Sequence, residues 1–156
     1  MAYDSRPRTI EHIEAVRSLA DLFIRKLRRR ADEHDASKLE DPELSMFNEY
    51  TPRLRELTYG SEEYKQCLRE MGEALQHHYE RNRHHPEHFS DGVRGMNLVD
   101  LVEMFLDWTA AARRHADGDL SESIEINAER FGLSADLQAI LANTVPVVEE
   151  ASTSEP

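Results

Sequence analysis

Cysteine is nearly absent from this sequence. Cys67 is the only one among 156 residues, so no disulfide can form within the chain. Proteins of the reducing cytoplasm commonly carry few cysteines and keep them as thiols. The first residues also lack the charged segment and apolar run that mark a secretory signal peptide. We therefore expect a cytoplasmic protein.

Long apolar runs are missing as well, since no segment approaches the ~20 apolar residues of a membrane-spanning helix. Positive charge is in short supply, and the formal net charge is −12. A protein that binds nucleic acid through long-range electrostatic attraction presents a positively charged surface to the phosphates. We expect neither membrane association nor stable nucleic-acid binding. A small, metal-chelated substrate suits the acidic surface better.

Strand patterns are the third absence, because apolar and polar residues do not alternate at length and no hairpin turn is flanked by β-branched runs. Apolar residues recur instead at spacings of three and four, which predicts helices. The first helix is expected to begin after an N-cap at Thr9, with the apolar stripe Ile13, Val16, Ala20, Phe23 and Leu27. We predict an all-α, single-domain helical bundle over residues 9–146. A flexible N-terminus (1–8) precedes it, and a disordered acidic tail (147–156) follows a last helix that ends near Pro146.

Histidine is concentrated in one stretch, residues 77–88, which holds five of the eight histidines. Imidazole is the commonest metal-binding side chain in proteins. The apolar face of the preceding helix continues at helical spacing to His78 and Asn82, so His78 is expected to point inward. His85-Pro86 ends this helix, because the residue before proline is pushed out of the α region. The alternative is a solvated loop that happens to be rich in histidine.

A line of acidic residues is the second unusual feature. On a helix predicted from Asn97 onward, Asp100, Glu103 and Asp107 fall on one side at ~100° per residue. Like charges at this spacing destabilise a helix, and apolar flanks that include Trp108 leave little room for water. One interpretation is a solvated acidic face. The other is a bound cation that compensates the buried carboxylates.

Together these features suggest a metal site in an all-α protein. Mixed imidazole and carboxylate ligands suit a divalent transition metal such as Mn, Fe, Co, Ni or Zn. Catalytic sites keep a position for water, whose pKa the metal lowers. The candidate ligands are His12, His34, Asp35, His78, His84, His85 and Asp107.

Three motifs carry a resemblance to a known superfamily. A histidine on the first helix, the His34-Asp35 dipeptide and a carboxylate on a later helix resemble the HD-domain metal-dependent phosphohydrolases. The phrase from His34 to Ser37 is similar to a motif of the bacterial 5′-nucleotidases in that group. The set HD-x-SK, H-x3-N-x-HHPEH and EM-x2-DW more specifically resembles a family of small, functionally uncharacterised proteins, many from phages and their hosts. It covers roughly residues 9–145.

The resemblance implies an HD-like fold with His12, His34, Asp35 and Asp107 as the first ligand set. It also implies that the histidines of the cluster, His78, His84 and His85, hold a second ion or contact the substrate. Lys38 departs from the nucleotidase pattern, which has a carboxylate at that position, so the acid–base assignment of those enzymes cannot be copied.

Several other residues are candidates for the chemistry. Lys38 can bind a phosphate oxygen as a point charge, and a general base can come from Glu103 or Glu87. The candidates for contact with substrate are Asn82, Asn127 and Arg130, whereas His77 and His88 are expected outside the ligand set.

The leading hypothesis is a phosphohydrolase that attacks a nucleotide or another small phosphoester with metal-activated hydroxide. An HD-type di-iron oxygenase is one alternative. Another is an all-α, Mg-dependent nucleotide pyrophosphohydrolase that binds Mg²⁺ through Asp100, Glu103 and Asp107. A non-catalytic, metal-stabilised module that binds another protein is the last. A monomer and a homodimer are both compatible with a core of this size.

Overall fold

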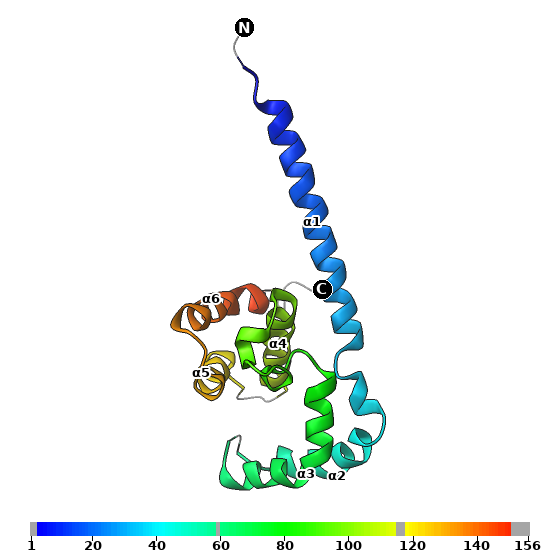
Figure 1. The fold of residues 1–156 in the computed structure, drawn as a ribbon. Helices are drawn as coiled ribbons and strands as arrows, with labels where there is room; N and C mark the ends of the chain where they lie inside the picture. Colours follow the sequence, from blue (N-terminus) through cyan, green and yellow to red (C-terminus); the bar gives the residue numbers. More distant parts are fainter. Residues whose placement is uncertain (1–2, 59, 115–117, 151–156) are drawn as a thin grey trace. The chain divides into compact units, whose positions relative to one another are not determined.

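The computed structural model describes residues 3–58, 60–114 and 118–150, and the regular structure within these ranges is entirely helical (Figure 1). The predicted all-α class is confirmed. The α-helices are α1 (Arg6–Glu33), α2 (Glu43–Arg55), α3 (Glu62–Arg81), α4 (Leu98–Ala112), α5 (Leu120–Phe131) and α6 (Ala135–Glu150), and the short 3-10 helices are η1 (Ala36–Leu39), η2 (Pro86–His88) and η3 (Gly92–Gly95). No described helix is both long and apolar enough to cross a membrane.

The chain divides into two compact units, Met1–His34 and Asp35–Pro156. Helix α1 makes up most of the first unit, and the remaining helices belong to the second. The candidate residues from Asp35 onward therefore share one unit. His12 and His34 lie in the other.

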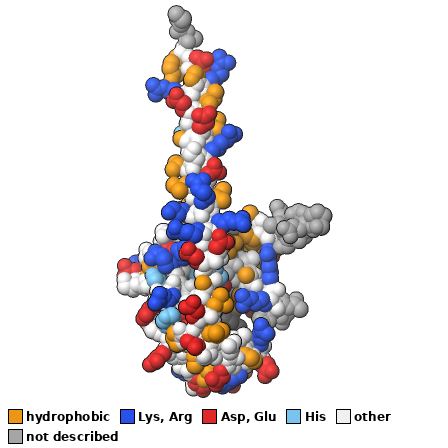
Figure 2. Space-filling view, turned by 90° about the vertical axis from the view of Figure 1, so that its right-hand side faces the viewer, with side chains coloured by type: hydrophobic (Ala, Val, Ile, Leu, Met, Phe, Trp, Pro, Cys, Tyr) orange, Lys and Arg blue, Asp and Glu red, His pale blue; other side chains and the backbone are white. Residues whose placement is uncertain are grey.

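Helix α1 begins earlier than predicted. Its N-cap is Ser5 rather than Thr9, because Pro7 in the first turn suits the start of a helix. Residues 6–8 of the expected flexible N-terminus are thus helical. The predicted apolar stripe is present but exposed, with Ile13, Val16 and Phe23 at 44%, 50% and 37% exposure (Figure 2). It forms one face of an amphipathic helix.

Helices α2 and α3 pack through a first apolar cluster in the second unit. Tyr50 from α2 and Cys67 and Met71 from α3 are its buried members. Helix α3 begins at Ser61, whose Oγ accepts from the Tyr64 amide as an N-cap. The three- and four-residue spacing of apolar side chains that predicted α3 is the spacing by which it packs. Its buried face leads on to His78 near the C-terminal end.

Helices α4, α5 and α6 form a second apolar cluster around α4. Its buried side chains are Met104, Phe105, Trp108, Leu120, Ile124, Leu141 and Val145. Asn97 caps α4 in a reciprocal capping box with Asp100. This cap sets the start of the helix that carries Glu103.

Helix α6 continues past the predicted stop at Pro146 as far as Glu150. The Arg113 guanidinium donates to the Val148 carbonyl at 2.6 Å, which ties the last turn of α6 to the end of α4. Tertiary packing therefore outweighs the helix-breaking tendency of the proline. Residues 147–150 of the expected disordered tail are helical, and residues 151–156 lie outside the described part of the chain.

Candidate metal centre

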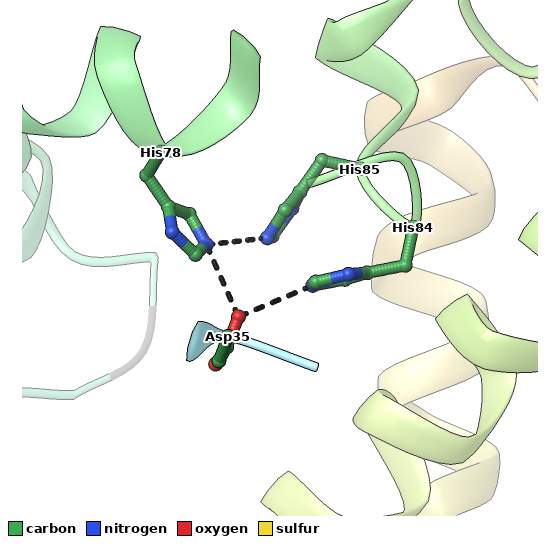
Figure 3. A group of neighbouring side chains, drawn as sticks. All are labelled: Asp35, His78, His84 and His85. Carbon is green, nitrogen blue, oxygen red and sulfur yellow. Dashed lines mark hydrogen bonds and ion pairs between the residues drawn. The ribbon is translucent and has the colours of Figure 1, made fainter. Parts of the chain in front are cut away.

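Four side chains from two separate segments converge in the second unit (Figure 3). Asp35 precedes η1, His78 lies in the last turn of α3, and His84 and His85 follow in the loop after α3. One ligand atom from each lies within 4.8 Å of the others. These four residues can hold a metal ion, and we call them the candidate metal centre.

Three short separations in the centre involve His78 or Asp35. Asp35 Oδ1 lies 3.4 Å from His78 Nε2 and 3.5 Å from His84 Nε2. His78 Nε2 lies 2.9 Å from His85 Nε2. Two donor atoms bound to one ion at about 2.0–2.2 Å lie roughly 2.8–3.6 Å apart when the angle at the ion is about 90–110°. Three of the six donor pairs are therefore spaced as they would be around a single ion.

The end of α3 brings the histidines of the loop back towards His78. Asn82 leaves the helical conformation at φ −115° and ψ 106°, and the His85 amide donates to its carbonyl at 3.3 Å. His85 is extended, as expected for a residue before proline. The ring centres of His78 and His85 are consequently 4.8 Å apart. Helix α3 therefore ends at Arg81, four residues before the predicted stop at His85, and Pro86 keeps the candidate ligand His85 extended.

Asp35 adopts an unusual backbone conformation. Its φ of 56° makes it the one residue other than glycine with positive φ in the described ranges. Aspartate tolerates the left-handed region better than most residues do, and such outliers concentrate at functional sites. Its two oxygens have different surroundings, because Oδ2 lies 2.6 Å from Lys38 Nζ while Oδ1 faces His78 and His84.

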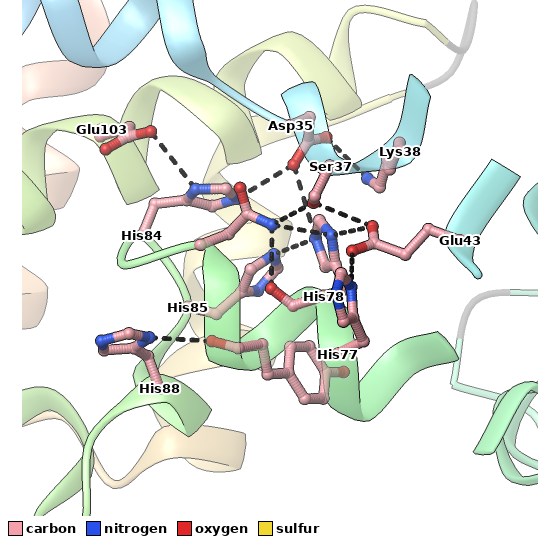
Figure 4. Close-up of polar contacts among 12 residues, drawn as sticks. Asp35, Ser37, Lys38, Glu43, His77, His78, His84, His85, His88 and Glu103 are labelled. Carbon is pink, nitrogen blue, oxygen red and sulfur yellow. Dashed lines mark hydrogen bonds and ion pairs between the residues drawn. The ribbon is translucent and has the colours of Figure 1, made fainter. Parts of the chain in front are cut away.

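A carboxylate stands behind His78 on the side away from the centre (Figure 4). Glu43, in the first turn of α2, is 0% exposed, and its Oε2 lies 2.8 Å from His78 Nδ1. Its Oε1 lies 2.7 Å from His77 Nδ1, and Ser37 Oγ donates to Oε2 at 3.0 Å. Burial acts to raise the pKa of Glu43, but the three hydrogen bonds outweigh it and the pKa is lowered. These hydrogen bonds therefore favour the ionised form of Glu43.

His84 has a similar arrangement. Its Nδ1 lies 3.3 Å from Glu103 Oε1, while its Nε2 faces Asp35. In metal sites a carboxylate on the far nitrogen of a histidine ligand fixes the ring and raises its basicity. Glu103, predicted as a candidate general base, stands in this supporting position behind His84.

Burial favours the neutral form of two imidazoles of the centre, His85 and His78, because it lowers the pKa of each. It lowers the pKa of His85 to about 3, helped by the neighbouring His84 and His78 and opposed by the charges of Asp107 and Asp35. Burial is also the largest cause that lowers the pKa of His78, with the charge of Lys38 acting in the same direction. Neutral imidazole is the form that binds metal ions. The geometry and the protonation states are therefore compatible with metal binding.

Three predicted ligands are not among the four residues of the candidate metal centre. His12 is exposed on α1, and His34 follows the last residue of α1, so both belong to the first unit. Asp107 lies one turn beyond Glu103 on α4, where its charge acts on His85. Their assignment as ligands stays a prediction.

The predicted substrate contacts mostly have structural partners. Asn82 is 7% exposed and donates through Nδ2 to Ser37 Oγ and to the His78 carbonyl, both at 2.8 Å. Asn127 donates to the Ser123 carbonyl one turn earlier on α5 at 2.9 Å. A hydrogen bond within the same helix needs no ligand to explain it.

Two further charged candidates form an ion pair. Arg130 Nη2 lies 2.8 Å from Glu87 Oε1 and joins α5 to η2. The guanidinium also stacks over the ring of Phe131 at 4.6 Å. The roles predicted for both, substrate contact for Arg130 and general base for Glu87, remain predictions.

Asp100 forms an ion pair with Arg83 and caps the start of α4. Its Oδ1 and Oδ2 accept from Arg83 at 3.1 and 3.0 Å, and Oδ2 also accepts from the Asn97 amide at 3.0 Å. Both oxygens are thus engaged by donors. This accounts for the burial of Asp100 without the magnesium ion of the pyrophosphohydrolase alternative.

Sequence reasoning missed Glu43. A glutamate just after Asp41-Pro42 looks like an ordinary acidic residue in the first turn of a helix, where it favours the dipole. Its role depends on His77 and His78, which are more than thirty residues away in the chain. Because the pattern around residue 43 is local, no signal in it identifies these partners. His88 was expected outside the ligand set. Its Nδ1 lies 2.9 Å from the Tyr79 carbonyl oxygen, which is a backbone contact outside the four-residue centre.

The fold and the site define an all-α protein with a candidate centre for a metal ion. The chain belongs to a family of unknown function, DUF5662, whose model matches residues 1–150. No curated protein and no solved structure matches the chain. The resemblance to HD-domain phosphohydrolases therefore stays a prediction.

Proposed function

We propose that this protein binds one divalent transition-metal ion at the candidate metal centre and uses it to hydrolyse a small phosphoester such as a nucleotide. The observation that carries the proposal is the convergence of one carboxylate and three imidazoles, with ligand atoms within 4.8 Å of one another. This donor set suits Zn, Mn, Fe, Co or Ni better than Mg or Ca, which prefer oxygen ligands.

The surroundings of the centre support metal binding over a simple hydrogen-bond network. Glu43 and Glu103 each stand behind one imidazole, on the nitrogen that faces away from Asp35. Two of the three imidazoles, those of His78 and His84, thus have a carboxylate behind the ring, which a simple hydrogen-bond network does not require. Carboxylate–imidazole pairs of this kind recur around metal ions, where they orient the ligand.

Hydrolysis is the reaction that the motifs favour. A bound divalent ion supplies Lewis acidity and lowers the pKa of coordinated water. Asp35 and the three imidazoles would hold it, with the Asp35 charge offsetting part of the charge of the ion. Lys38, 2.6 Å from Asp35 and 4.8 Å from the centre of the Phe47 ring, is held at the edge of the centre. From there its ammonium group can pair with a phosphate oxygen. The resemblance of HD-x-SK to phosphohydrolase motifs is the reason to choose this reaction.

One observation favours a second candidate, a metal-stabilised module without catalysis. Structural zinc sites use four protein ligands in a closed tetrahedron, whereas catalytic sites have three and keep one position for water. Four protein side chains converge here. If all four bind at once, the ion stabilises the fold and does no chemistry.

Metal analysis of the purified protein, followed by a substrate panel, tests the proposal. We expect about one transition-metal ion per chain, and phosphate release from one or more nucleoside mono-, di- or triphosphates with Mn, Co, Ni or Zn. A visible spectrum of the Co²⁺ form distinguishes four-coordinate tetrahedral geometry from a more open site. Metal without phosphate release and with a tetrahedral spectrum supports the structural module. Iron with oxygen consumption supports the oxygenase alternative.

A matched pair of variants assigns the ion to the centre. His84→Ala is expected to abolish stoichiometric metal binding, whereas His88→Ala, in the same segment but hydrogen-bonded to Tyr79, is expected to retain it. A wild-type protein that binds no transition metal after exposure to each of these ions contradicts the proposal.

A further inference from the structure

Glu43 is a wholly buried carboxylate with three donors around it and no predicted role. It comes from α2, whereas His77 and His78 come from α3 and Ser37 from η1. A buried charge is costly unless it is paired and hydrogen-bonded. Since Glu43 is 0% exposed, its contacts with these side chains are the reason that it can be ionised there.

The hydrogen bonds that Asn82 and Glu43 form around His78 indicate which nitrogen of its ring carries the hydrogen. The two hydrogens of Asn82 Nδ2 go to the His78 carbonyl and to Ser37 Oγ, each at 2.8 Å. Asn82 Nδ2 also lies 3.0 Å from His78 Nδ1 but has no third hydrogen to donate to it. An ionised carboxylate is only an acceptor, so His78 Nδ1–H donates to Glu43 Oε2. In the neutral ring, Nε2 then carries the lone pair.

That lone pair faces the centre. His78 Nε2 is the atom that lies 3.4 Å from Asp35 Oδ1 and 2.9 Å from His85 Nε2. A ring with its hydrogen on Nε2 instead would present a donor at this point and could not bind a cation there. The tautomer of His78 therefore decides whether this residue can be a ligand.

We propose that Glu43 is a positioning residue for the centre, which fixes the His78 tautomer and ring orientation so that the Nε2 lone pair points at the metal position. The effect on metal affinity rests on the proposed function, whereas the effect on the tautomer does not. Ser37 and Asn82 support Glu43, because Asn82 donates to Ser37 and Ser37 donates to Glu43.

Because the two oxygens of Glu43 have different partners, we expect different results from two substitutions of this residue. Oε2 accepts from both His78 and Ser37, whereas Oε1 accepts from His77, whose side chain is 32% exposed. In Glu43→Gln the single carbonyl oxygen is expected to stay with His78 and Ser37. The amide NH₂ then faces His77, which changes its tautomer at little cost near water. Glu43→Leu removes both acceptors.

Metal titration against a chromophoric chelator, with Zn²⁺ as the probe, tests the effect on affinity. Substitution of carboxylates behind histidine ligands typically lowers metal affinity by about 10–100-fold. We expect a loss in this range for Glu43→Leu and a smaller loss for Glu43→Gln. The matched control is the same pair of substitutions at Glu49, which is exposed on the same helix. These variants are expected to bind Zn²⁺ like the wild type.

Nitrogen chemical shifts of the imidazoles in the metal-free protein test the tautomer directly. We expect His78 to carry its hydrogen on Nδ1 in the wild type and in Glu43→Gln, and His77 to switch only in Glu43→Gln. An Nε2–H tautomer of His78 in the wild type overturns the proposal, as does wild-type affinity in a folded Glu43→Leu protein. If Glu43→Leu does not fold, the tautomers of the wild type and of Glu43→Gln decide. A wild type that binds no metal but shows the Nδ1–H form contradicts the proposed function and leaves the role of Glu43 in orienting His78 supported.

Discussion

Asp35 Oδ1 lies 3.4 Å from His78 Nε2, although Asp35 precedes η1 and His78 lies in the last turn of α3. His84 approaches the same oxygen at 3.5 Å from the loop beyond α3. Asp35 thereby joins the first residues of the second unit to its histidine-rich segment. The consequences of this convergence can be measured.

Asp35→Asn is expected to weaken metal binding by about tenfold or more, because it removes the one carboxylate of the centre and replaces a charged ligand by a neutral amide. The measurement is a competition titration with a chelator. Asp41→Asn is the matched control, since Asp41 is exposed and bonded to Ser45. Equal affinities for the Asp35 variant and the wild type would show that Asp35 is not a ligand.

Saturation with Zn²⁺ is expected to raise the unfolding temperature of the wild type. An ion that binds the folded state alone stabilises it by about 2.7 kcal/mol at a free concentration of 100 Kd. Thermal unfolding in Zn²⁺ and in EDTA measures the difference. The shift should disappear in His85→Ala. A shift that persists in this variant would place the ion elsewhere.

Asp100→Ala is expected to destabilise the protein by about 0.5–2 kcal/mol without changing its affinity for transition metals. It removes the acceptor of the Asn97 amide and the partner of Arg83. A lost cap costs about 0.5–2 kcal/mol, and the ion pair adds little because the Arg83 side chain is 43% exposed. Urea unfolding measures the first effect and chelator competition the second. Loss of Mg²⁺-dependent nucleotide hydrolysis in this variant would instead favour the pyrophosphohydrolase alternative.

Acid is expected to destabilise the metal-free protein between about pH 6.5 and pH 3. The pKa of His85 falls from 6.5 to about 3 in the folded protein because of burial. In this window the unfolded chain therefore binds more protons than the folded one. The free energy of unfolding rises with pH wherever that holds. The contribution of His85 to the free energy of unfolding is therefore complete above pH 6.5 and is lost as the pH falls towards 3.

Urea unfolding at several pH values in the presence of EDTA checks this expectation. His85→Gln should flatten the dependence, since glutamine does not titrate. A pH profile that is the same in the wild type and in this variant would contradict the lowered pKa. His88→Gln serves as the control, because His88 has no part in the centre.

Local patterns predicted the helices well and their ends less well. The three- and four-residue spacing reports which face of a helix is apolar, and it correctly placed His78, which is 1% exposed, on the inner face of α3. The start at Thr9 and the stop at Pro146 were wrong. Helix ends depend on contacts such as the one from Arg113 to Val148, which a local pattern does not contain.

The amino-acid sequence by itself determined the all-α class, the ending of α3 before Pro86 and the supply of histidines near His78, because these follow from the periodicity and chemistry of neighbouring residues. Only the tertiary structure decided which of them meet. In the folded protein Asp35 lies beside His78 and His84, Asp100 pairs with Arg83, and Glu43 lies behind His78. A carboxylate has the same appearance in the sequence whether it faces water, an arginine or an imidazole. The packing of helices distant in the chain determines its partner.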